Sequence, residues 1–104
     1  GIAISACPPD SGYSPLIAAQ AADELISIKG IQASFVLAER EGAISISGRS
    51  LGEINVQLIL EKLGGGGHLA VAGAQLKGST MDAAVNRLTQ AVHEYLQESG
   101  MGQP

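Results

Sequence analysis

The chain has 104 residues, of which 45% are hydrophobic, and six Lys and Arg against ten Asp and Glu give a formal net charge of −4. This length supports one domain with a single hydrophobic core. The acidic balance argues against a domain that grips a long nucleic acid, because such domains carry a basic patch for the phosphate backbone. The few aromatic residues (Tyr13, Phe35 and Tyr95) predict an aliphatic core and offer no evident stacking platform for single-stranded bases.

Cysteine content and hydropathy bear on the compartment. A single cysteine, Cys7, rules out an internal disulfide, and its place in an apolar run favours a packed thiol over a nucleophile. No segment resembles a signal peptide or a membrane span of about 18 residues. We therefore expect a reducing, cytoplasmic location and no membrane contact by this domain, although a longer parent protein could be anchored elsewhere.

The first third of the chain predicts a strand and a helix. Residues 1–7 form an apolar run that ends at two prolines, which predicts a buried strand. Ser14 before Pro15 predicts a helix start, with the hydroxyl as the cap and proline at the first helical position. Gly30 is expected to stop this helix. Its buried face is predicted from apolar spacings of three and four: Ile17, Ala21, Leu25 and Ile28.

A hairpin follows. Residues 32–40 and 43–50 read as strands on either side of Glu41-Gly42, a two-residue loop in which glycine can take a positive φ. Strand side chains alternate between faces, so the second strand is expected to turn its polar residues away from its isoleucines. This polar face, which we regard as a candidate working surface, consists of Ser45, Ser47 and Arg49.

The remaining elements are two helices and a strand. Asn55 can cap a helix whose apolar positions are Val56, Ile59, Leu60 and Leu63. "GAQLKG" at 73–78 predicts a short strand, and Thr80 can cap a last helix with the stripe Met81, Ala84, Val85, Leu88, Val92 and Leu96. The order β-α-β-β-α-β-α predicts an α/β domain, a mixed sheet covered by helices, over residues 1–98. Residues 99–104 are expected to be a disordered tail.

Four consecutive glycines, residues 64–67, need a specific explanation. One glycine suffices to end the helix at Leu63. Without Cβ atoms, successive amides can point into a common concavity, and a short helix starting at His68 would add its free N–H groups, which predicts a phosphate cradle. A flexible linker or a turn for close helix–strand packing is the alternative.

"GGGGHLAVAG" at 64–73 resembles the Gly-Gly-Gly-His-x-x-Ala-Ala-Gly signature of the DHH-associated domain, the C-terminal half of the DHH phosphoesterases. "SGRSLGEINVQLILEKLGGGGH" at 47–68 and "AAQAADELISIKGIQASFVL" at 18–37 resemble more narrowly the cyclic di-AMP phosphodiesterase branch, the GdpP-like enzymes. The likeness covers roughly residues 2 to 98.

This resemblance implies a substrate-binding lobe that closes over a separate catalytic lobe, in which an Asp-His-His motif and other side chains hold two manganese ions. The substrate would be cyclic di-AMP or a short dinucleotide. This chain has no Asp-His-His and only two histidines, so it cannot assemble a two-metal site. We expect it to be part of a longer enzyme, to carry no cofactor of its own and to be inactive alone.

The resemblance also assigns roles to particular residues. His68 would bond a phosphate oxygen that faces the metals, and Arg49 would clamp another phosphate. Val71 stands where the family commonly has alanine, which would narrow the contact between the glycine turn and its neighbour. Backbone contacts to the nucleotide would come from Gly65, Gly66 and Gly67, with Ser47 and Ser50 as lesser neighbours.

Two further readings stay open. A related domain ends alanyl-tRNA synthetases, so an RNA-binding appendage is one, although the net charge disfavours it. A structural or homodimerising module, whose glycine turn packs another helix, is the other. His93, on the polar side of the last helix, reads as a solvated histidine, while Asp23 and Glu24 read as ordinary helix-surface acids.

Overall fold

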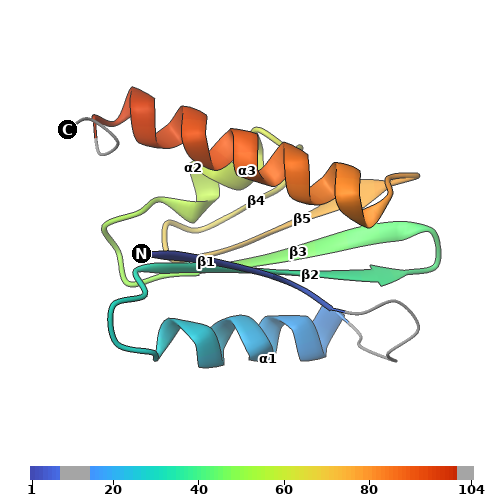
Figure 1. Cartoon of the computed structure of the whole chain (residues 1–104), viewed down its shortest axis with the longest axis horizontal. Coiled ribbons are helices and arrows are strands. Elements are labelled where there is room, and N and C mark those ends of the chain that lie inside the picture. Colours follow the sequence, from blue (N-terminus) through green and yellow to red (C-terminus); the bar gives the residue numbers. More distant parts are fainter. Residues whose placement is uncertain (8–14, 101–104) are drawn as a thin grey trace.

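The computed structural model describes residues 1–7 and 15–100, and Figure 1 shows the arrangement of its elements. The described part contains three helices and five strands in mixed order. They are β1 (Ile2–Ala6), α1 (Pro15–Ile26), β2 (Ala33–Arg40), β3 (Ala43–Ser50), α2 (Val56–Glu61), β4 (Gly66–Gly67), β5 (Val71–Lys77) and α3 (Met81–Glu98).

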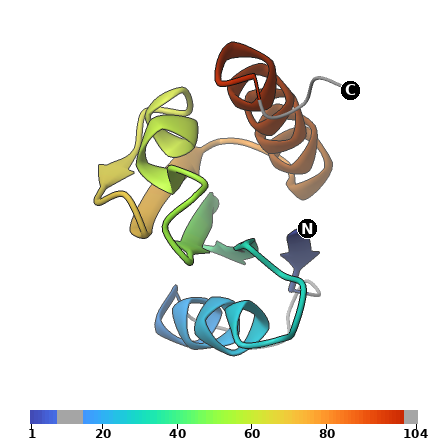
Figure 2. The same ribbon diagram turned by 90° about the vertical axis from the view of Figure 1, so that its left-hand side faces the viewer.

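All five strands form one sheet in the order β1-β2-β3-β5-β4. β1 runs parallel to β2 and the other neighbours are antiparallel. Figure 2 shows α1 on one face of the sheet and α2 with α3 on the other. The predicted α/β class with a helix-covered mixed sheet is confirmed. No helix within the described ranges combines the length and apolarity that a membrane crossing requires.

The central hairpin forms at the predicted place. Glu41 and Gly42 have φ values of 54° and 77°, so both loop residues take the left-handed conformation of a tight two-residue turn. β2 and β3 then pair over their full length, from Ala33 opposite Ser50 to Arg40 opposite Ala43. This long register fixes which side chains of β3 face α1.

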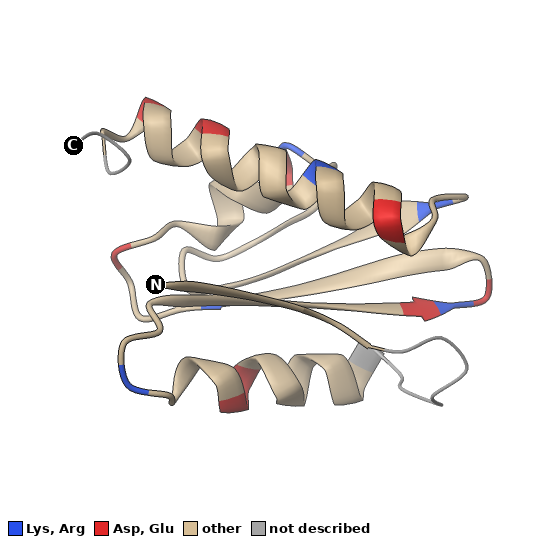
Figure 3. Cartoon of the chain, viewed as in Figure 1, with Lys and Arg blue, Asp and Glu red and all other residues tan. Residues whose placement is uncertain are grey.

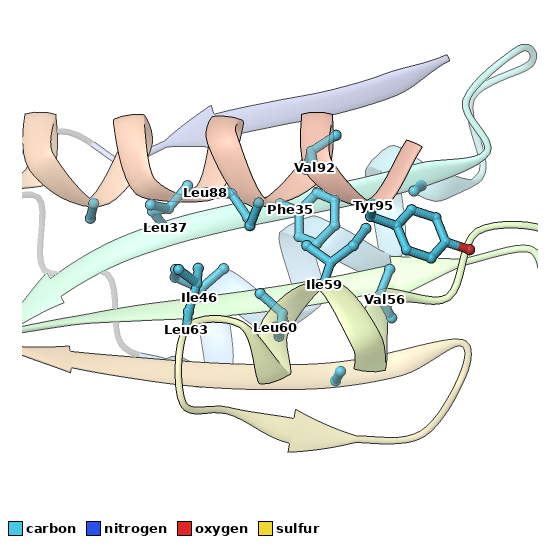
Figure 4. Packing of buried hydrophobic residues seen from close by; sticks show 14 of the residues in the cluster. Phe35, Leu37, Ile46, Val56, Ile59, Leu60, Leu63, Leu88, Val92 and Tyr95 are labelled. Carbon is cyan, nitrogen blue, oxygen red and sulfur yellow. The ribbon is translucent and has the colours of Figure 1, made fainter. Parts of the chain in front are cut away.

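The main core lies between the sheet and the α2–α3 layer (Figure 4). Both predicted caps form: the Asn55 side chain accepts from Leu58 N–H and the Thr80 side chain accepts from Ala83 N–H, each at 3.1 Å. In α3 the buried face also includes Ala91 and Tyr95, which the predicted stripe omitted. The largest fully buried apolar side chains are Phe35, Val36, Leu37, Ile44, Ile46, Val56, Ile59, Leu60 and Leu88.

Two predictions for the N-terminal part are wrong in detail. β1 is an edge strand, not a buried one: it pairs with β2 alone among the described strands, and Ile4 is 36% exposed. In α1 the fully buried residues are Ala18 and Ala22, and Ala21 and Leu25 of the predicted stripe pack beside them. The other two stripe residues, Ile17 and Ile28, are 39% and 54% exposed, so the packed face is shifted from the prediction towards Ala18 and Ala22. Alanines form the buried face of α1 because their small side chains let the helix backbone lie close to the sheet. The predicted cap Ser14 lies outside the described residues.

The end of α1 also differs from prediction, whereas α3 ends at the residue where the predicted domain ends. α1 ends at Ile26, and Gly30, with a φ of 91°, belongs to the turn that leads into β2. α3 continues to Glu98 and is capped by Ser99. Of the predicted tail, 99–104, residues 101–104 lie outside the described residues, so its disorder stays a prediction.

Candidate functional site

Cross-strand pairing brings the glycine run next to the polar face of β3. Ser47 lies opposite Gly73 on β5, and Gly73 lies opposite Gly66 on β4. Directly paired residues share a face, and Ser47 is itself opposite Val36, which packs under α1. We call this row, Ser47, Gly73 and Gly66, the glycine shelf. It is a strip of nearly bare backbone that continues the α1 side of the sheet.

Arg49 and His68 belong to the neighbouring row. Arg49 lies opposite Val71, and the His68 N–H donates to Val71 O at 2.7 Å. Strands are spaced by roughly 4.8 Å, so the backbones of Arg49 and His68 are about 10 Å apart. Val71 is 48% exposed, so its side chain lies at the open surface between Arg49 and His68. The valine that stands in place of alanine was expected to narrow the contact between the glycine turn and its neighbour, and the exposure of Val71 does not fit that expectation.

Backbone hydrogen bonds hold the loop that carries His68. The Ser50 N–H donates to Ala70 O at 2.9 Å, and the Val56 N–H donates to Leu69 O at 3.0 Å. The end of β3 and the start of α2 therefore each donate one backbone hydrogen bond to the connection between β4 and β5. This arrangement makes the strand end and the glycine–histidine turn direct neighbours.

The glycine run does not form the predicted set of free amides. Residues 68–70 lie outside any helix and Val71 opens β5, so the predicted short helix is absent. Gly64 and Gly65 donate to Glu61 O and Leu60 O at 3.1 and 2.8 Å. In an antiparallel ladder hydrogen-bonded and non-hydrogen-bonded pairs alternate, so the bond at His68 turns the Gly67 N–H towards the outer sheet edge.

The fold explains two of these glycines by close backbone approach. A Cβ on Gly65 would lie 2.2 Å from Gly73 O, and one on Gly67 would lie 2.6 Å from Val71 O. Gly66 is different, because a Cβ there would meet nothing within 4 Å and its φ is not positive. Gly73 has no positive φ either, and a Cβ there would make one ordinary contact at 3.4 Å. The bare surface of the glycine shelf is thus not demanded by packing.

Arg49 lies on the polar face of β3, as predicted, but α1 covers most of its side chain. Its Nε donates to Asp23 Oδ1 at 2.6 Å, and its Nη1 donates to its neighbour's carbonyl, Gly48 O, at 2.8 Å. The Arg49 side chain is 15% exposed and that of Asp23 is 61% exposed. A guanidinium has five N–H bonds, so three remain without a partner among the described residues.

Sequence reasoning missed Asp23, which it treated as a surface acid. Asp23 and Arg49 are 26 positions apart, and they meet because α1 packs across β2 and β3. Local patterns do not reveal such a contact.

The other candidate residues differ in availability. Ser50 Oγ accepts from Gly52 N–H at 2.9 Å and so serves the local turn, while Ser47 Oγ makes no hydrogen bond within residues 1–7 and 15–100. Cys7 is half-buried, and desolvation raises the pKa of its thiol. His93 is exposed, beside a cleft of about 620 Å³ between β1 and α3.

The distribution of charged residues and of possible metal ligands bears on what the domain can bind. In Figure 3 the Lys and Arg residues are spread over separate helices, strands and loops of the chain, with Asp and Glu residues among them. In the described parts of the chain, no three His, Cys, Asp or Glu side chains gather as a metal site would require.

Comparison with known proteins gives the family. Residues 1–98 match the model of the DHHA1 domain. Cyclic-di-AMP phosphodiesterase PdeA of Listeria monocytogenes is 51% identical over 96 residues, which cover 91% of this chain and 15% of that protein. Cyclic-di-AMP phosphodiesterase GdpP of Geobacillus thermodenitrificans is 45% identical over 98 residues, again 15% of its length. The bifunctional oligoribonuclease and PAP phosphatase NrnA of Thermus thermophilus is 44% identical over 73 residues, or 70% of this chain and 22% of that one.

Solved structures agree with this assignment. An exopolyphosphatase-related protein from Bacteroides fragilis is similar with a TM-score of 0.63 and 36% identity, over 71% of this chain and 22% of that one. The C-Ala domain of Aquifex aeolicus alanyl-tRNA synthetase is similar with a TM-score of 0.68 over 91% of this chain and 87% of that one, but at 15% identity it shows the fold alone. From its sequence match and its architecture, the chain belongs to the DHHA1 domain family.

Proposed function

We propose that this chain is the substrate-binding domain of a longer, manganese-dependent DHH phosphodiesterase that hydrolyses cyclic di-AMP or short dinucleotides. The observation that carries the proposal is the glycine shelf beside Arg49, a bare strip that packing does not require. The 51% identity to a cyclic-di-AMP phosphodiesterase supports the substrate class. The chain spans about 15% of that relative. In this proposal the catalytic lobe and its metal ions belong to another part of the longer enzyme.

In this proposal Arg49 supplies the main charge for the ligand. Its three remaining N–H bonds can reach two oxygens of one phosphate, a geometry that a lysine cannot copy. The low exposure of its side chain reduces competition from water. One directed cation suffices for a small ligand, which reconciles phosphate binding with the net charge of −4.

His68 and the glycine shelf complete the proposed site. The shelf lets a nucleotide lie against backbone, because neither Gly66 nor Gly73 projects a side chain. His68 is exposed at the loop next to Val71, where its imidazole can donate to a phosphate oxygen. Manganese on the catalytic lobe would supply the charge that activates water, while the residues of this domain bind and orient the substrate.

The test is calorimetric titration of the longer enzyme with cyclic di-AMP and with linear di-adenylate. Arg49→Ala should weaken binding roughly ten- to a hundredfold, the effect of losing a charged hydrogen bond, and Arg49→Lys should recover part of it. Arg87→Ala is the matched control, since Arg87 is exposed on α3, across the sheet from α1. Equal affinity of Arg49→Ala and parent would overturn the proposal, and binding of tRNA in place of the dinucleotides would favour the RNA-binding reading.

A further inference from the structure

Asp23 connects the helix α1 to the proposed phosphate ligand Arg49. Its Oδ1 lies 2.6 Å from Arg49 Nε, the guanidinium nitrogen nearest the backbone. The second fixed contact, from Nη1 to Gly48 O at 2.8 Å, lies on a different nitrogen. Together these contacts fix the plane of the guanidinium and leave its remaining donors on Nη1 and Nη2.

The helix turn that carries Asp23 is itself tied to the sheet. Ser34, a fully buried residue of β2, donates its hydroxyl proton to Ala22 O at 2.7 Å. Ser34 is also the residue directly opposite Arg49 in the β2–β3 ladder. The paired residues Ser34 and Arg49 therefore both contact this turn of α1. Ser34 fixes the backbone next to Asp23, and Arg49 donates a hydrogen bond to the Asp23 carboxylate.

We propose that Asp23 is a positioning residue for substrate, which holds the Arg49 guanidinium so that Nη1 and Nη2 face the glycine shelf. This inference rests on the proposed function. An arginine side chain has several rotatable bonds, and fixing them before the ligand arrives removes an entropy cost from binding. The buried hydrogen bond from Ser34 to Ala22 O fixes the helix backbone from which the Asp23 side chain extends.

The opposite role for Asp23 would be competition with the phosphate. A carboxylate beside an anion site repels the ligand, but Asp23 is 61% exposed, and water screens its charge. Its contact occupies Nε, whereas two phosphate oxygens can be met by the Nη1 and Nη2 edge. Positioning therefore outweighs repulsion, and the sign of the effect of removing Asp23 distinguishes the two roles.

The experiment measures KM and kcat of the longer enzyme for cyclic di-AMP in four variants: Asp23→Ala, Asp23→Asn, Arg49→Ala and the double variant Asp23→Ala/Arg49→Ala. Asp23→Ala should raise KM roughly three- to tenfold with kcat nearly unchanged, and Asp23→Asn, which keeps an acceptor oxygen, should recover part of the loss. In the Arg49→Ala background the Asp23→Ala change should have no further cost. Glu24→Ala is the matched control, because Glu24 is the adjacent exposed acid and has no ion pair among the described residues.

A spectroscopic readout separates positioning from folding. In nuclear magnetic resonance spectra of the enzyme, the Arg49 Nε–H signal should be protected from exchange in the parent and in Asp23→Asn, and lost in Asp23→Ala. An unchanged or lowered KM in Asp23→Ala, with Arg49→Ala still impaired, would overturn the role of Asp23 while the proposed function stands. No effect of Arg49→Ala would overturn the proposed function itself.

Discussion

Gly66 on β4 lies directly opposite Gly73 on β5, and the fold forces neither position to be glycine. A methyl group at Gly66 would project into open space over the glycine shelf. Glycine in a strand costs roughly 0.5–1 kcal/mol relative to alanine, so Gly66→Ala should leave the domain equally stable or slightly more stable. Because the methyl group occupies the proposed ligand surface, dinucleotide affinity should fall about tenfold. Calorimetry and thermal melting of the same sample measure both effects, and unchanged affinity would remove the shelf from the site.

Gly65 provides the matched comparison one residue away. Its Cβ would lie 2.2 Å from Gly73 O and 2.6 Å from Ala74 Cβ, where the backbone itself must move. Gly65→Ala should therefore destabilise the domain by at least about 1–3 kcal/mol, the usual cost of overpacking. Urea denaturation followed by circular dichroism gives this value. A Gly65→Ala domain as stable as the parent would show that β4 does not approach β5 as closely as described.

His68 is expected to act in turnover more than in folding. Its side chain is exposed, and its structural contact runs through the backbone N–H, which substitution retains. If the imidazole bonds a phosphate whose charge grows during attack, His68→Ala should lower kcat by roughly ten- to a hundredfold and change KM less. Steady-state kinetics of the longer enzyme, with a melting curve as the folding control, tests this. A larger change in KM than in kcat would assign His68 to ground-state binding.

Local signals in the sequence predicted much of this fold. Glu41-Gly42 defined the hairpin because few residues accept the left-handed backbone of such a turn, and Asn55 and Thr80 marked helix starts because their side chains replace missing acceptors. Apolar spacing located the core face of α2 and most of α3. These features depend on neighbours within a few residues, so a single sequence can reveal them.

The rest depended on contacts between distant segments. Residues 1–7 contain no signal that their strand lies at the edge of the sheet. In α1, small alanines pack against the sheet more closely than Ile17 does, and this decides which face of the helix is buried. The Asp23–Arg49 pair follows from that packing and was missed with it. For the glycine run, the sequence predicted either close backbone approach or ligand contact. The fold shows close approach at Gly65 and open space beside Gly66.

Tyr95, a core residue that the predicted stripe omitted, links α3 to the start of α2. Its hydroxyl oxygen accepts a hydrogen bond from the Asn55 N–H at 2.9 Å. Tyr95→Phe keeps the ring in the core but leaves the Asn55 N–H without that acceptor, so the free energy of unfolding should fall by about 1–2 kcal/mol. Urea denaturation of parent and variant measures the loss. A variant with parental stability would mean that water replaces the hydroxyl at this half-buried position.

Lys62, after the end of α2, should make stability depend on alkaline pH. Its Nζ lies 2.6 Å from Glu98 Oε1 and 3.7 Å from Glu94 Oε2 on α3, and the hydrogen bond to Glu98 is the main cause that raises the pKa of Lys62 above its ordinary value.

A lysine whose pKa is higher in the folded than in the unfolded chain stabilises the fold fully below its unfolded pKa, and the contribution is lost as pH rises through the folded pKa. The parent should therefore be more stable than Lys62→Met near pH 9, with a gap that shrinks towards about pH 12. Lys29→Met is the control, since Lys29 has no ion pair in the described part of the chain. Denaturation midpoints across this pH range decide the matter, because a gap between parent and Lys62→Met that stays constant would show that the Lys62–Glu98 contact contributes nothing through its charge.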